Sequence, residues 1–169
     1  MSNHHKLEAQ FNRANISDKD FAEAESYLRI HCDDLPNTLR RALFTAAIIA
    51  YARPFTSNDS GTKGLATGTL VRNPKRILDE KEFALHKKIL ILRNEAIAHS
   101  SYERKPTRFA GTVGTAFLAW TKSFDVLSEE ISASAFLTIC LKMKRHCTDT
   151  LFSLSRDLDS QSSERRKGA

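Results

Sequence analysis

The chain has 169 residues, 41% of them hydrophobic and 27% charged, which suits one globular domain with a real hydrophobic core. Its longest apolar run, residues 42–50, is far shorter than the roughly 20 residues of a membrane-spanning helix. Three cysteines without a CxxC pair exclude a disulfide scaffold and are typical of buried thiols in a reducing compartment. With no signal-peptide core at the N-terminus, the sequence predicts a cytoplasmic protein with no membrane partner. The net charge of +6 suits an anionic partner such as nucleic acid, and equally a basic protein that stays soluble.

The first half of the chain contains two predicted helices. Residues 1–16 are polar and poorly patterned, so we expect a flexible N-terminal tail. Apolar residues at three- and four-residue spacing then predict a helix from Ser17 or Asp18 to about Cys32. A second, central helix starts at Pro36 and ends near Ala52, because the proline at position 54 disfavours helical geometry in the residue before it.

The second half contains two longer predicted helices. A long connection over 54–78 leads to a helix spanning about 79–99, whose first turn carries acidic residues that favour a helix N-terminus. The fourth helix spans about 132–158, and residues 160–169 are expected to be a flexible C-terminal tail. The fold class is therefore all-α, a bundle of four to five helices over residues 17–159.

Residues 103–128 break the helical pattern. The segment 109–121 is rich in glycine, β-branched and aromatic residues, which predicts a short hairpin or irregular flap around 105–125. Trp120 and Phe117 in this flap could stack on bases, or could pack onto the bundle or a second subunit.

One short stretch near the end of the third helix has a chemical use, because it combines Arg93, Asn94 and His99. Arg93 and His99 are roughly 120° apart on an ideal helix, and they converge if the helix ends at His99. A helix C-terminus favours protonated imidazole, so a titrating group would lie beside a permanent cation.

This stretch resembles the motif of the HEPN superfamily. That motif has an arginine, usually a polar residue, and a histidine, and here they are Arg93, Asn94 and His99 on the third helix of a small bundle, with five residues between Arg93 and His99. The resemblance implies a metal-independent endoribonuclease without a cofactor, often a toxin or defence effector, that acts on RNA as a homodimer. It implies that His99 is the general base or acid, that Arg93 stabilises the phosphate, and that Asn94 orients the reacting groups.

The resemblance also implies an antitoxin or nucleotidyltransferase partner. One toxin subgroup carries a tyrosine two residues past the histidine that such a partner modifies, whereas Tyr102 lies three residues past His99. Tyr102 and four basic side chains are candidates for further RNA contacts: Arg53, Arg72, Lys75 and Arg76. A basic loop that only keeps the protein soluble explains the basic side chains equally well.

One alternative function remains open, and a DNA-binding role and a zinc site are disfavoured. Some HEPN-like domains bind RNA, nucleotides or partner proteins without cleaving anything, and this non-catalytic scaffold is the main alternative. A helical DNA-binding regulator is disfavoured because the connections are too long for a helix-turn-helix. The pairs His31-Cys32 and His146-Cys147 lack the spacing of a zinc site, so we expect no metal there. His86 lies seven residues before Arg93 on a similar side of the helix and could line the same groove, but we expect it to be a surface residue.

Overall fold

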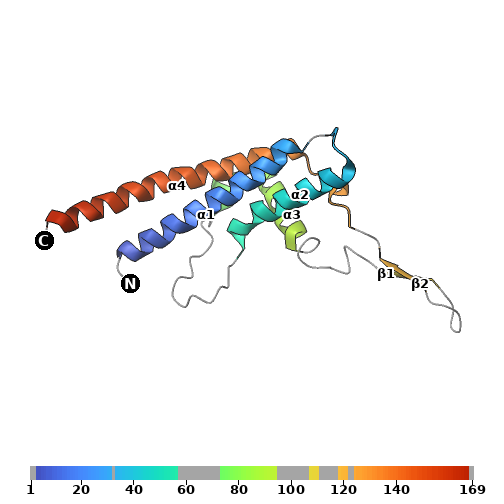
Figure 1. Cartoon of the computed structure of the whole chain (residues 1–169), viewed down its shortest axis with the longest axis horizontal. Helices are drawn as coiled ribbons and strands as arrows, with labels where there is room; N and C mark the ends of the chain where they lie inside the picture. Colours follow the sequence, from blue (N-terminus) through green and yellow to red (C-terminus); the bar gives the residue numbers. More distant parts are fainter. Residues whose placement is uncertain are drawn as a thin grey trace.

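Four α-helices form the fold in the computed structural model, which describes residues 3–31, 33–56, 73–94, 107–110, 118–121 and 124–167. In chain order they are α1 (Asn3–Ile30), α2 (Asn37–Ala52), α3 (Glu80–Leu92) and α4 (Ala133–Lys167). Figure 1 shows α1 and α4 side by side with both chain termini at one end, so these two helices are antiparallel. Because α2 packs on α1 and α3 packs on α2 and α4, the predicted all-α bundle is confirmed.

Helix α1 begins at Asn3, whereas the sequence pattern placed its start at Ser17 or Asp18 and a tail before it. Its buried positions alternate at three- and four-residue spacing, and they are Ala14, Ser17, Phe21, Ala24 and Leu28. Arg13 is buried beside this stripe. Because polar residues occupy part of the buried face, a hydrophobic pattern cannot reveal that the helix extends so far toward the N-terminus.

Helix α4 provides the surface on which α1 packs. Its buried residues also alternate at four- and three-residue spacing, at Phe136, Cys140, Met143 and Cys147. Two polar contacts add to the packing: Thr148 Oγ1 donates to Asp18 Oδ1 at 2.9 Å, and Lys144 Nζ donates to Glu25 Oε2 at 2.8 Å. The helix continues to Lys167, so residues 160–167, expected as part of a tail, are helical.

Helix α2 is the central helix, as its sequence predicts. Its second half is buried through six residues: Phe44, Ala47, Ile48, Ala50, Tyr51 and Ala52. The helix ends at the predicted position but not by the predicted mechanism. Arg53 keeps α-helical dihedral angles, and the chain tightens into a 3₁₀ turn, η1 (Arg53–Phe55), with Pro54 inside it.

Helix α3 begins with a capping box. The Asp79 side chain accepts from the Glu82 amide, and the Glu82 carboxylate accepts from the Asp79 amide, both at 2.9 Å. The helix is regular to Leu92, and Arg93 retains α-helical dihedral angles. The last part of the predicted third helix, residues 95–99, lies outside the described residues.

The predicted hairpin is present. Strand β1 (Thr107–Ala110) pairs antiparallel with β2 (Leu118–Thr121), with Thr107 opposite Thr121. Phe117 lies outside the described residues. The connections also contain two 3₁₀ turns, η2 (Pro74–Arg76) and η4 (Val126–Glu129), of which η4 packs on α2.

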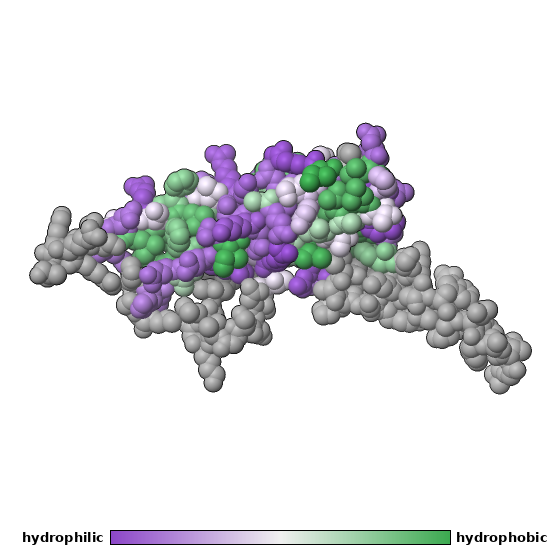
Figure 2. All heavy atoms as spheres, viewed as in Figure 1, coloured by the Kyte–Doolittle hydropathy of each residue, from purple (hydrophilic) through white to green (hydrophobic). Residues whose placement is uncertain are grey.

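The viewed face of the molecule mixes both kinds of side chain. In Figure 2, hydrophilic residues cover much of the middle of the described part, and hydrophobic residues gather toward its two ends. Among the residues that the structure describes, no helix combines the length and apolar character that a bilayer crossing requires.

Candidate functional site

Arg93 and Asn94 lie at the end of α3, where the helix reaches the surface. Arg93 is partly exposed and Asn94 is exposed. Arg93 Nη1 donates a hydrogen bond to Asn94 Oδ1 at 3.0 Å. Two neighbouring residues of the motif are therefore hydrogen-bonded to each other, while the third, His99, lies outside the described residues.

The packing of α3 explains this position. His86 and Ile89 precede Arg93 by seven and four residues, so they share its side of the helix, and both are buried against the bundle. Leu92, directly before Arg93, is also fully buried. Arg93 thus follows the buried residues of α3 on the same side of the helix, and it is itself partly exposed.

The charge environment of Arg93 differs from that of several other arginines. Four arginines form ion pairs with carboxylates, and they are Arg29, Arg40, Arg41 and Arg53. Within the described part of the chain, the hydrogen bond of the Arg93 side chain goes to a neutral amide oxygen instead. Among the described residues, no ion pair between Arg93 and a carboxylate is present.

The other residues expected to bind RNA lie in different settings. Arg53 is engaged by Asp20 and Glu23 of α1, with the Asp20 oxygen at 3.3 Å. Arg76 is exposed in η2, and Lys75 places its Nζ 5.2 Å from the centre of the Phe83 ring. Arg72 and Tyr102 lie outside the described residues.

A second lysine lies close to the Phe83 ring. Lys87 Nζ also lies 5.2 Å from the centre of the Phe83 ring, so two ammonium groups gather near the start of α3. Phe83 precedes Arg93 by ten residues, which corresponds to about 15 Å along the helix axis. The two groups of cations are thus separate places on α3.

The expectation for His86 is wrong, because its side chain is buried and only 3% exposed. Its Nδ1 lies 3.0 Å from the Tyr51 hydroxyl, with which it shares a hydrogen bond. Burial lowers the pKa of His86 to about 4, so the imidazole is neutral at physiological pH. The sequence signal that could have found it is the spacing of three from Phe83 and from Ile89, which places all three residues on one side of the helix.

The cysteines behave as expected where the structure describes them. Cys140 and Cys147 are buried free thiols, and Cys32 lies outside the described residues. Across the described ranges, no three histidine, cysteine or acidic side chains lie close enough together to hold a metal ion.

No family model, curated protein or solved structure matches the chain in sequence or fold comparisons.

Proposed function

We propose that the chain is a metal-independent endoribonuclease of the HEPN type, with Arg93, Asn94 and His99 as its catalytic residues. The observation that supports this proposal is the hydrogen-bonded Arg93–Asn94 pair at the exposed end of α3, with the guanidinium unpaired to any described carboxylate. Asn94 Oδ1 accepts from the guanidinium and so fixes its orientation, which is the geometry that a phosphate-binding arginine requires.

The proposed reaction uses the 2′-hydroxyl of the RNA as its nucleophile. His99 removes the proton from this hydroxyl, and the 2′ oxygen forms a bond to phosphorus while the bond to the 5′ oxygen breaks. The leaving 5′ oxygen takes up a proton from a protonated imidazole. The products are a 2′,3′-cyclic phosphate, which can open to a 3′-phosphate, and a 5′-hydroxyl.

Arg93 and Asn94 have complementary parts in this reaction. The guanidinium of Arg93 binds the scissile phosphate and stabilises the negative charge that builds up in the transition state. The amide oxygen of Asn94 accepts from Nη1 and so orients the guanidinium, while the amide nitrogen stays available to the phosphate or to His99.

The active form in this proposal is a homodimer in which the two copies of the motif meet in one cleft. Each chain supplies one arginine and one histidine, so two copies provide a neutral imidazole as the base and a protonated one as the acid. The net charge of +6 and the exposed Arg76 favour an RNA substrate. A role as a toxin or defence effector, with an antitoxin or nucleotidyltransferase partner, is part of the same proposal.

The test is cleavage of tRNA and other structured RNAs by the purified chain in the presence of EDTA. We expect cleavage with cyclic-phosphate ends, and its loss in both His99→Ala and Arg93→Ala. Two substitutions on α4 are matched controls, since His146→Ala and Arg145→Ala remove the same side chains away from the motif.

Three outcomes would separate the alternatives. Equal cleavage by the parent and the two motif variants would refute the catalytic assignment. A mass that stays at that of one chain across micromolar concentrations would refute the composite cleft. RNA binding without cleavage, by a well-folded dimer, would instead support a non-catalytic binding domain with the same fold.

A further inference from the structure

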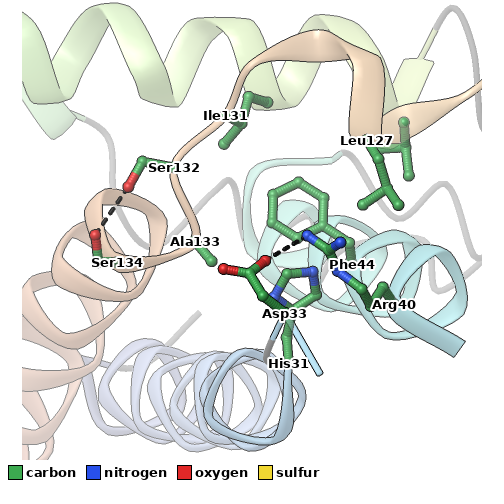
Figure 3. A pocket seen from close by; sticks show the side chains of 10 residues that line it. His31, Asp33, Arg40, Phe44, Leu127, Ile131, Ser132, Ala133 and Ser134 are labelled. Carbon is green, nitrogen blue, oxygen red and sulfur yellow. Dashed lines mark hydrogen bonds and ion pairs between the residues drawn. The ribbon is translucent and has the colours of Figure 1, made fainter. Parts of the chain in front are cut away.

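A pocket of about 450 Å³ lies where α1 ends and α4 begins. Its walls come from the turn after α1, from α2, from η4 and from the start of α4 (Figure 3). This volume is in the range of small-molecule sites. Neither Arg93 nor Asn94 lines it, so the pocket is separate from the proposed catalytic site.

The lining combines an apolar part with a polar part. Phe44, Leu127 and Ile131 contribute apolar surface, and the His31 ring lies against Phe44 with 5.3 Å between ring centres. Arg40 and the hydroxyls of Ser132 and Ser134 contribute hydrogen-bond donors. Figure 3 shows Arg40 and His31 on one side of the pocket and the two serines on the other. A ligand that fits this lining has an apolar body and a group rich in acceptors.

Two of the lining residues each contain a buried nitrogen atom without a hydrogen-bond partner among the described residues. His31 Nε2 and Arg40 Nε are shielded from solvent and have no hydrogen-bond partner among the described residues. Buried polar atoms in proteins are normally hydrogen-bonded, because leaving them unbonded is costly. Because neither nitrogen is accessible to solvent as it lies, a ligand oxygen would bond to it only after a side-chain rotation that turns it toward the pocket.

The first turn of α4 adds further donors. Ser132 Oγ accepts from the Ala135 amide at 3.2 Å, and the Ser132 and Ser134 hydroxyls lie 2.8 Å apart. The first amide groups of an α-helix lack acceptors within the helix and carry partial positive charge, which favours anions. Unlike an isolated helix N-terminus, this one faces a guanidinium and an imidazole across a formed pocket.

The guanidinium of Arg40 already binds one oxyanion, the carboxylate of Asp33. Arg40 Nη2 donates to Asp33 Oδ1 at 2.6 Å, and the Asp33 side chain is 91% exposed while that of Arg40 is 24% exposed. An exposed carboxylate held by one ion pair is worth little stabilisation, so another anion can displace it. Asp33 is then a competitor for the guanidinium, and its charge weakens binding of any external anion.

We propose that this pocket binds a phosphate monoester whose organic part is aromatic. The phosphate has three terminal oxygens, which match the donors of Arg40, the serine hydroxyls and the first turn of α4 better than the two oxygens of a carboxylate do. The aromatic part lies against Phe44 and the apolar side of the pocket. This site is independent of RNA cleavage.

Calorimetry on the full chain with phenyl phosphate, benzoate and inorganic phosphate tests the proposal. Phenyl phosphate should bind most tightly, and Arg40→Gln should weaken it by about tenfold or more. Asp33→Asn should strengthen it several-fold by removing the competing charge. Arg41→Gln is the matched control, since Arg41 lies next to Arg40 on α2, pairs with Asp125 and is absent from the lining.

Several results would overturn the proposal. One is the absence of phenyl phosphate binding at millimolar concentration by the folded parent. Another is equal binding by Arg40→Gln and the Arg41→Gln control. Benzoate binding as tightly as phenyl phosphate would refute the phosphate preference, and inorganic phosphate binding as tightly would refute the role of the apolar side. Circular dichroism and thermal unfolding of each variant identify losses that come from misfolding, and Asp33→Asn then provides a gain that misfolding cannot produce.

Discussion

The Tyr51 hydroxyl and Nδ1 of His86 lie 3.0 Å apart inside the bundle, where they join α2 to α3. Aromatic rings surround the pair, with the Phe55 ring centre 4.6 Å and the Phe83 ring centre 5.8 Å from that of His86. Burial lowers the pKa of His86 to about 4 and raises the pKa of Tyr51 well above its usual value. Both side chains are therefore neutral in the folded protein at physiological pH.

The buried imidazole makes the free energy of unfolding depend on pH. Because the pKa of His86 is about 4 in the folded state and about 6.5 when unfolded, the unfolded chain binds more protons between these values. Stability therefore falls as the pH is lowered through this window. The part due to His86 should be about 2 kcal/mol between about pH 7 and pH 5.

Urea denaturation of the parent and of His86→Gln at several pH values checks this prediction. Glutamine keeps a hydrogen-bonding side chain but does not titrate, so the variant should lose less stability on acidification. Parallel pH profiles for the two proteins would show that His86 is not the group responsible.

Removing the hydroxyl of Tyr51 should destabilise the fold without changing its shape. Tyr51→Phe leaves His86 Nδ1 without this partner in a buried position, which is expected to cost about 1–3 kcal/mol. Tyr27→Phe is the control, because the Tyr27 hydroxyl donates to Glu23 at 2.9 Å in a half-buried position. Denaturation midpoints compare the two, and a larger loss for Tyr27→Phe would contradict the importance of the buried pair.

The thiols on α4 should be unreactive in the folded protein. Burial raises the pKa of Cys140 and of Cys147 to about 12, so almost no thiolate exists near neutral pH. In a Cys32→Ser background, a thiol reagent should label the native chain only at the rate of unfolding, and both sites rapidly in denaturant. Fast labelling of the native chain would show that α1 does not cover these residues.

Substitutions of Leu92 and Arg93 should have different effects: Leu92→Ala should lower stability, and Arg93→Ala should leave stability nearly unchanged. Leu92 is fully buried, so Leu92→Ala is expected to cost about 2–5 kcal/mol of stability. Arg93 is partly exposed and its side chain bonds only the neighbouring Asn94 among the described residues, so Arg93→Ala should change stability by no more than about 0.5 kcal/mol. Thermal unfolding measures both. A large loss in Arg93→Ala would indicate a structural arginine instead of a phosphate-binding one.

Local patterns were enough to predict where three of the four helices begin. Pro36, the acidic residues from Asp79 and the polar Ser132 are features of helix starts that depend only on neighbours in the chain, and α2, α3 and α4 begin at or directly after them. The position of Arg93 near the end of α3 follows from the same local reasoning. A hairpin or an irregular flap was also predictable, since the composition of this segment favours extended structure over a helix, and the structure shows the hairpin.

The start of α1 was not predictable in this way. Its buried face includes Arg13 and Ser17, and Arg13 Nη2 donates to the Pro54 carbonyl at 3.2 Å, forty-one residues away. From the sequence alone, a buried polar residue cannot be distinguished from a solvent-exposed one, because its burial depends on which element packs over it.

The sequence by itself therefore determined the helical class, the central place of α2, the burial of Cys140 and Cys147, and the position of Arg93 and Asn94 near the end of α3. Only the tertiary structure decided that His86 is buried against Tyr51, that Arg53 is paired with acidic residues of α1, and that His31, Arg40 and Ser132 line one pocket. The physical reason is that periodicity and capping are properties of neighbouring residues. The burial and pairing of a polar side chain instead depend on groups that the fold brings from distant parts of the chain.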